Sequence, residues 1–233
     1  MPHRWPLLLI SVVPLALLAA EPAPSTGTVA GTVRFTGKVP PAKKITTTDG
    51  ATIEHNDLVV EPKSKGLRYV FVLLEDAPAQ AKLNKAESVV VDQRDMIFVP
   101  RMVAVRHGQA VKFDNSDLCN HSVQAVSTVA ANQFNKFTAP NNPLEHVFEP
   151  QKKPVVIGCA LHGWMRAWVY VVPHPWFAVT DAEGRFRLAE VPAGKHTLSF
   201  SHPDTGLQER KEVQVEKGQT ATVNVDWEKV AEK

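Results

Sequence analysis

The feature that most constrains this chain is a long succession of short β-branched runs separated by Gly, Pro, Asn and Asp turns, with hardly a convincing helical segment. These runs include "TVAGTVRF", "LRYVFVLL", "MVAV", "AVKF", "PVVIG", "AWVYVV", "HTLSF" and "TATVNV". Runs of this length, interrupted by turn residues at short intervals, are typical of antiparallel sheets packed face to face. The sequence therefore predicts an all-β fold made of two β-sandwiches.

The strands fall into two sequence styles that meet at "PHPW", residues 173–176. From residue 177 onward, clear hairpin signals stand at "DAEG" and "PAG", and a third turn follows at "EKGQ". A chain of 233 residues is long enough for one large or two small domains, each with its own core. The change of style at this break therefore indicates that two sandwiches share the chain.

The first twenty residues have a short basic start, an apolar middle and small residues before Glu21. This pattern predicts a signal peptide over residues 1–20, followed by a Pro/Ala/Ser linker over residues 21–26. Pro6 and Pro14 argue against a stable membrane span, and no later segment is apolar enough to cross a bilayer. We expect a periplasmic or secreted protein with no stable membrane insertion after cleavage. The formal charge of +2, without a basic run, does not imply nucleic acid as a partner.

Three soft side chains stand close together in "GCALHGWM", residues 158–165, directly after an apolar run: Cys159, His162 and Met165. A thiolate, an imidazole and a weak axial thioether describe a trigonal blue copper site, which needs one more imidazole. His121 in "NSDLCNHSV" is the best placed, because it follows a strand that ends in Asn115 and two loops at one end of a sandwich can converge. Copper is therefore the predicted cofactor.

Two segments, "FDNSDLCNHSV" and "VVIGCALHGWM", resemble the ligand loops of the cupredoxins, the blue copper proteins. The short gap between His162 and Met165 is similar to the ligand loop of amicyanin more than to the longer loop of plastocyanin. The resemblance implies that His121 and His162 supply imidazoles, Cys159 the thiolate and Met165 a long axial bond. It further implies a one-electron carrier for a larger redox partner, such as a dehydrogenase or a cytochrome. Similar exported proteins carry a methylamine-utilisation label.

Three neighbouring residues modify this interpretation. Asn115 ends the strand before His121, and Trp164 either shields the copper and tunes it or caps the core. Cys119 lies two residues before His121, and an extended backbone would point both side chains to the same side. A disulfide between Cys119 and Cys159 would consume the thiolate and leave a metal-free scaffold or adhesion module. If both sulfurs bind metal instead, the protein suits copper binding and delivery. These alternatives stay open, and no general base pair or open coordination position implies an enzyme.

The segment "AVTDAEGRFRLAEVPAGKHTLSFSHPDTG" resembles the carboxypeptidase regulatory-like, transthyretin-like β-sandwich, an accessory scaffold without catalysis of its own. That family opens with a strand like the one found far upstream in "GTVAGTVRFTGKVPPAKKI". We expect a split sandwich made of residues 27–76 and 174–229, with a cupredoxin domain over residues 77–173 between them. The alternative is two consecutive domains, with the early strands belonging to the copper unit.

Overall fold

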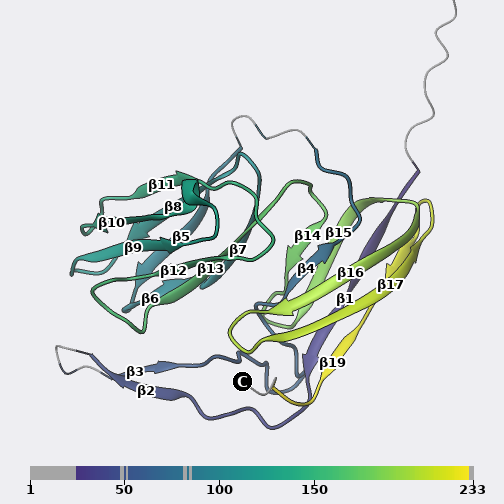
Figure 1. The fold of residues 1–233 in the computed structure, drawn as a ribbon. Coiled ribbons are helices and arrows are strands. Elements are labelled where there is room, and N and C mark those ends of the chain that lie inside the picture. The colour runs from purple at the N-terminus through teal and green to yellow at the C-terminus, as the bar shows by residue number, and fades with distance from the viewer. Residues whose placement is uncertain (1–24, 48–49, 51, 81–82, 84–85, 231–233) are drawn as a thin grey trace, which may run out of the picture.

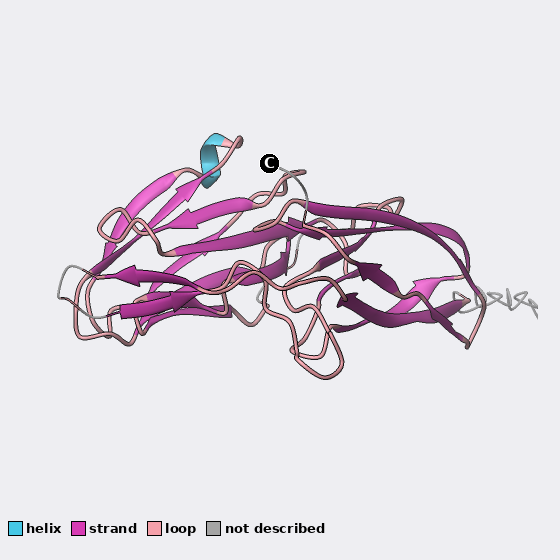
Figure 2. Cartoon of the chain, turned by 90° about the horizontal axis from the view of Figure 1, so that it is seen from below, coloured by secondary structure: helices cyan, strands magenta, loops and turns pink. Residues whose placement is uncertain are grey.

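The computed structural model describes residues 25–47, 50, 52–80, 83 and 86–230. The predicted signal peptide and most of the predicted linker lie outside these residues, and the first strand already begins at Thr26. Strands dominate the described chain, and its only helix is the 3-10 turn η1 (Ala130–Asn132), as Figure 2 shows. The prediction of an all-β fold is confirmed. None of the described helices is long and apolar enough to cross a membrane.

The larger sandwich is formed by the middle of the chain, drawn in teal to green in Figure 1. One of its sheets has the order β10-β9-β12-β13-β7 and the other the order β11-β8-β5-β6. Their strands are β5 (Val89–Arg94), β6 (Ile97–Val99), β7 (Met102–Arg106), β8 (Ala110–Asn115), β9 (His121–Val126), β10 (Phe134–Thr138), β11 (Leu144–Val147), β12 (Val155–Gly158) and β13 (Arg166–Val172). Alternation along each strand sends every second side chain into a shared core that includes Phe113, Phe148 and Ile157.

The smaller sandwich joins the beginning of the described chain to its end, so that purple β1 lies beside yellow strands in Figure 1. One sheet has β1 between β15 and β18, with β19 also paired to β1, and the other has the order β14-β4-β16-β17. Their strands are β1 (Thr26–Phe35), β4 (Phe71–Leu74), β14 (Phe177–Val179), β15 (Arg185–Pro192), β16 (Gly194–His202), β17 (Leu207–Val215), β18 (Thr220–Thr222) and β19 (Val225–Trp227). A Cβ on Gly31 of β1 would lie 1.7 Å from the carbonyl oxygen of Val223, so glycine is required there.

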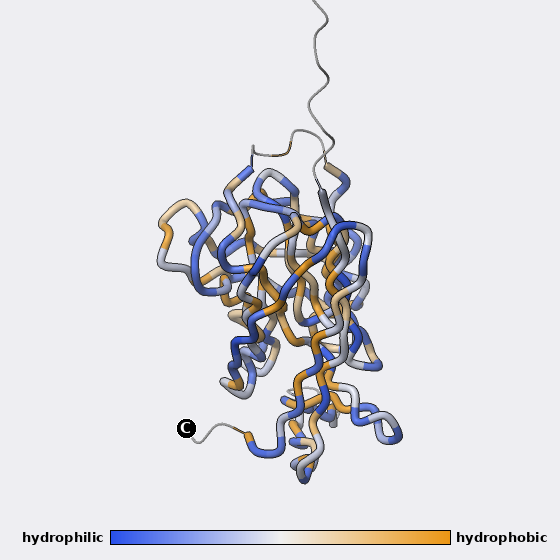
Figure 3. Tube along the Cα trace, turned by 90° about the vertical axis from the view of Figure 1, so that its right-hand side faces the viewer, coloured by the Kyte–Doolittle hydropathy of each residue, from blue (hydrophilic) through white to orange (hydrophobic). Residues whose placement is uncertain are grey.

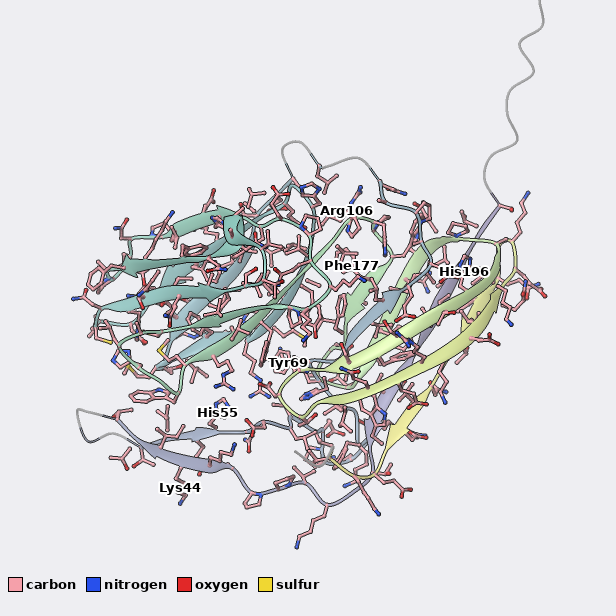
Figure 4. All side chains as sticks on the ribbon, in the orientation of Figure 1. Lys44, His55, Tyr69, Arg106, Phe177 and His196 are labelled. Carbon is pink, nitrogen blue, oxygen red and sulfur yellow. The ribbon has the colours of Figure 1, made fainter. Side chains whose placement is uncertain are left out.

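The sandwiches pack against each other through a third apolar cluster between β4 and β14 on one side and β7 and β13 on the other. Phe71 of β4 stacks on Tyr170 of β13, with ring centroids 3.8 Å apart. Tyr69 and Phe177 lie at this junction in Figure 4. A buried ion pair between Arg101 and Asp204, at 3.2 Å, also crosses it. Hydropathy alternates along the strands of both units in Figure 3, as expected for sheets with one buried face.

A two-stranded arm, β2 (Lys43–Thr46) and β3 (Thr52–His55), leaves the smaller sandwich and runs beside the larger one. The guanidinium of Arg101 donates to the carbonyl oxygens of Asn56 and Asp57 just after this arm. Lys44 points outward from the arm in Figure 4, whereas His55 faces the two sandwiches. The arm is therefore tied to the larger sandwich at its base.

Candidate metal centre

Two adjacent strands place the first two predicted ligands at one end of the larger sandwich. His121 is the first residue of β9, and Cys159 directly follows β12. The strands pair antiparallel, with Ile157 opposite Ala125, so the start of β9 meets the end of β12. The inward alternation of both strands includes His121, which is 0% exposed, and Cys159, which is 4% exposed. Strand register thus brings together residues that are 38 positions apart.

The loop after β12 brings His162 to the same point. The Nδ1 atoms of His121 and His162 lie 3.0 Å apart, and Cys159 Sγ lies 3.9 Å from the first and 3.6 Å from the second. A trigonal ion with bonds of about 2.0 Å to nitrogen and about 2.3 Å to sulfur separates its ligands by about 3.5 to 3.7 Å. The three donor atoms therefore fit one ion with adjustments of a few tenths of an ångström.

The environment of Cys159 favours a thiolate. Burial raises the pKa of the thiol, but hydrogen bonds from His121 and from the backbone of Ser122 and Leu161 outweigh it and lower that pKa to about 6. The Ser122 N–H donates to Sγ at 3.3 Å. Burial acts against the charged form of His121, yet the neighbouring Cys159 and Asp117 leave its pKa raised. The site thus favours the thiolate of Cys159, which is the form of cysteine that binds a metal ion.

Asp117 holds the far side of the His121 ring, a contact that the sequence did not predict. Its Oδ2 lies 2.8 Å from His121 Nε2. A carboxylate there accepts a hydrogen bond from the Nε2–H group. The neutral ring then keeps its lone pair on Nδ1, which faces the ligand cluster. The pair orients the imidazole with its Nδ1 towards Cys159 and His162. The only signal in the sequence is a carboxylate four residues before a candidate histidine, which is too common to identify it.

Asn115 stabilises the loop between β8 and β9 through hydrogen bonds of its side chain. Its side-chain amide donates to the carbonyl oxygens of Cys119 and Thr138, each at 3.0 Å, and its Oδ1 accepts the N–H of Asp117 at 3.1 Å. The residue is 1% exposed. It therefore fixes the segment between β8 and β9.

Trp164 and Met165 complete the second loop. The Met165 N–H donates to the His162 carbonyl at 3.0 Å, and its side chain is buried in the same apolar cluster as Cys159. The Trp164 ring lies 5.3 Å from the His162 ring, and its Nε1 donates to the Met96 carbonyl at 3.0 Å. Trp164 thus lies beside the imidazole and packs on the core, and its role toward a copper ion stays a prediction.

Cys119 lies on a segment that is not extended, yet its side chain reaches His121. The segment between β8 and β9 bends, because Asn115 closes a turn onto Asp117, and Cys119 becomes exposed. Its Sγ lies 3.5 Å from His121 Nε2, whereas Cys159 Sγ approaches Nδ1 of the same ring. Both cysteines are thiols in the structure. The His121 ring thus has one sulfur beside each of its two nitrogens.

Comparisons with known proteins return one family model and several solved structures. Residues 166–228 match the family model of the carboxypeptidase regulatory-like domain, which confirms the resemblance of the final segment. A search of curated proteins finds no significant match. Among solved structures, a purple cupredoxin from Nitrosopumilus maritimus is 21% identical and covers 36% of this chain and 99% of its own, with a TM-score of 0.31. An amicyanin variant in the Cu(I) form is 19% identical over 43% of this chain and 97% of its own, with a TM-score of 0.33. A Cu-containing nitrite reductase from Thermus scotoductus is 19% identical over 41% and 24% of the respective chains, with a TM-score of 0.34.

Proposed function

We propose that the protein binds one copper ion through His121, Cys159 and His162 and carries single electrons to or from a larger redox partner. The observation that carries this proposal is the convergence of two imidazole Nδ1 atoms and one buried sulfur within 3.9 Å of one another. Two imidazoles and a thiolate in a plane are the donor set of electron-transfer copper sites. We assign the weak axial position to Met165.

The surroundings of these ligands suit electron transfer because they hold the ligands in place before metal arrives. His121 is fixed by Asp117, and Cys159 by the Ser122 backbone on the neighbouring strand. A rigid ligand set that lies between the geometries preferred by Cu(I) and Cu(II) needs little movement when the ion changes charge. The copper would supply the redox step, and the chain would supply a dry, fixed cavity.

Exposed apolar side chains around the site support docking of a redox partner. Leu118 is 98% exposed, Leu161 is 53% exposed and Phe137 is 63% exposed. Leu118 belongs to the loop before β9, Leu161 lies between two ligands, and Phe137 pairs across the sheet with Ser122. An apolar rim at the end where His162 is partly exposed gives a partner a short path to the metal. Together with the predicted signal peptide, this apolar rim supports an exported electron carrier. The smaller sandwich would serve as its accessory scaffold.

The proposal is tested by adding Cu(II) to the reduced, mature protein and recording the visible spectrum. An intense thiolate-to-copper charge-transfer band is expected in the wild type and in Cys119→Ser, and its loss in Cys159→Ser. Far-UV circular dichroism serves as the folding control for both variants. Absence of the band in the wild type, or its persistence in Cys159→Ser, would contradict the proposed centre.

Docking is tested separately by the electron self-exchange rate, measured from NMR line widths in mixtures of oxidised and reduced protein. Leu161→Lys is expected to slow self-exchange because it places a charge in the rim. Val90→Lys is the matched control, since Val90 is 44% exposed on β5, which belongs to the opposite sheet. Equal rates in the two variants would argue against a docking role for the rim.

A further inference from the structure

The outer side of His121 carries a second group of metal-binding atoms that the proposed copper centre does not use. Cys119 Sγ lies 3.5 Å from His121 Nε2 and 3.6 Å from Met96 Sδ. Asp117 Oδ2 contacts the same Nε2 at 2.8 Å. Cys159 and His162 approach the ring from its Nδ1 side instead. One soft sulfur, Cys119 Sγ, therefore stands next to the nitrogen that faces away from the first centre, and a second, Met96 Sδ, stands next to Cys119 Sγ.

Two separate loops are tied together to build this group. Met96 belongs to the tight turn between β5 and β6, where Asp95 and Met96 have positive φ angles of 55° and 62°. The N–H groups of both residues donate to the Asp117 carboxylate, at 2.7 and 3.0 Å. Non-glycine residues adopt this conformation at a cost, so these two hydrogen bonds help to hold the turn in place. The Asn115 amide holds the Cys119 carbonyl from the other side.

The donor atoms define the kind of ion that would bind. A thiolate and a thioether are soft ligands that select Cu(I), and an imidazole is compatible with it. A three-coordinate ion with metal–sulfur bonds of about 2.3 Å and a metal–nitrogen bond of about 2.0 Å separates its ligands by about 3.7 to 4.0 Å. Cys119 Sγ lies 3.5 Å from His121 Nε2 and 3.6 Å from Met96 Sδ, so these two separations need to widen only slightly. Cys119 is exposed, so an ion reaches it directly from solvent.

We propose that Met96, Cys119 and His121 Nε2 form a second, surface site for Cu(I), on the solvent side of the first centre. Binding releases the thiol proton of Cys119 to solvent, and the copper keeps its oxidation state. The proton on His121 Nε2 moves to Nδ1 of the same ring. There it is donated in a hydrogen bond to the Nδ1 of His162, which lies 3.0 Å away. This site goes beyond the electron-transfer function and does not require the first centre to hold metal.

Sharing one imidazole gives the two sites an order of use. When copper occupies Nδ1, the proton returns to Nε2 and is held by Asp117, so the second site keeps only its two sulfurs. The second site therefore binds Cu(I) best while the first is empty. It acts as a capture site from which Cu(I) moves around the His121 ring to Cys159.

The binding claim is tested by anaerobic competition for Cu(I) with a chromophoric Cu(I) chelator, using the full chain with Cys159→Ser to disable the first centre. This variant is expected to retain one Cu(I), with two sulfur neighbours in X-ray absorption. Adding Cys119→Ser should weaken the binding at least about tenfold, the loss typical of removing support from a metal site. Adding Met96→Leu should weaken it several-fold, and adding Val126→Ser, an exposed substitution at the far end of β9, should leave it unchanged.

The proposal is overturned if Cys159→Ser retains no Cu(I), or if Cys119→Ser and Met96→Leu leave its affinity unchanged. It is also overturned if Zn(II) binds more tightly than Cu(I) and independently of Met96, which would indicate a site made of Asp117, Cys119 and His121. The capture role has its own measurement in the otherwise wild-type chain. Cys119→Ser should slow withdrawal of Cu(I) from the chelator without changing the final amount bound, and an unchanged rate removes that role. A missing Cu(II) charge-transfer band would contradict only the first centre.

Discussion

The carboxylate of Asp117 is the contact whose removal tests the site most directly. Its Oδ2 holds His121 Nε2 at 2.8 Å, with the imidazole side chain 0% exposed and the carboxylate 14% exposed, so water screens the contact little. Asp117→Asn keeps the shape of the side chain but removes its charge. One amide oxygen can still accept the Nε2 proton, although the amide nitrogen then faces the N–H of Asp95.

The expected loss follows from the change in hydrogen-bond type. A hydrogen bond to a charged group contributes about 1.5 to 3 kcal/mol, whereas a neutral one contributes about 0.5 to 1.5 kcal/mol. The difference of roughly 1.4 kcal/mol corresponds to about a tenfold weaker affinity. The carboxylate makes the imidazole more basic, which favours Cu(II) over Cu(I). If only Cu(II) binding falls tenfold, the reduction potential rises by about 59 mV.

The measurement pairs Cu(II) competition with voltammetry of the copper-loaded protein. A role limited to folding would lower stability without moving the potential in this direction. Asp114→Asn is the matched control, because it removes the same charge from a side chain that pairs with Lys112 on the surface. The reasoning is refuted if Asp117→Asn leaves affinity and potential within error of the wild type, or if both substitutions shift the potential equally.

Three further predictions concern the scaffold, and urea unfolding measures each of them. Burial, with a smaller contribution from Arg101, lowers the pKa of His202 from 6.5 to about 4, so the unfolded chain binds its proton first as pH falls. Stability present above pH 6.5 should therefore decline towards pH 4 by about 3 kcal/mol, and a flat profile, or the same profile in His202→Gln, would contradict this. Gly31→Ala should cost about 1 to 3 kcal/mol because its Cβ meets the Val223 carbonyl, and wild-type stability would refute that clash. Phe71→Ala should cost about 3 kcal/mol and separate the unfolding of the two sandwiches, since its ring stacks on Tyr170 between them; a single transition of unchanged midpoint would count against that coupling.

The four predicted ligand residues could be selected from the sequence because their chemistry is rare and three of them are closely spaced. Cys159, His162 and Met165 lie within one loop, and alternation along the preceding "VVI" already turns Cys159 inward. His121 was selected because it follows a strand that ends in Asn115. In the structure it is the first residue of the next strand, β9. The roles of these four residues as ligands stay predictions for the copper titration to test.

The surroundings of the ligands could not be predicted in the same way. Met96 and Asp117 are separated by 21 residues, and only the turn between β5 and β6 brings the Met96 N–H to that carboxylate. The position of Cys119 beside His121 Nε2 depends on a bent loop, which a hydrogen bond from the Asp117 N–H to the Asn115 side chain holds out of the extended conformation. Side-chain to backbone bonds of this kind compete with regular structure and leave no periodic signal.

The division of the chain into domains was also only partly predictable from the sequence. The pairing of β1 with β15 and of β4 with β16 supports a smaller sandwich made of residues 27–76 and 174–229 around residues 77–173. The boundaries of these units stay a prediction. The motif at the end of the chain pointed to a missing first strand, but only the sheet identifies β1 as the strand that pairs with β15, β18 and β19.

By itself the sequence determined the fold class and the identity of the soft side chains, because alternation, turn residues and donor chemistry are local properties. The tertiary structure decided which nitrogen of His121 faces which sulfur, and that Asp117 and Met96 lie on its outer side. These contacts depend on strand register and loop bending between residues far apart in the chain, and such long-range pairing is not encoded in any short stretch.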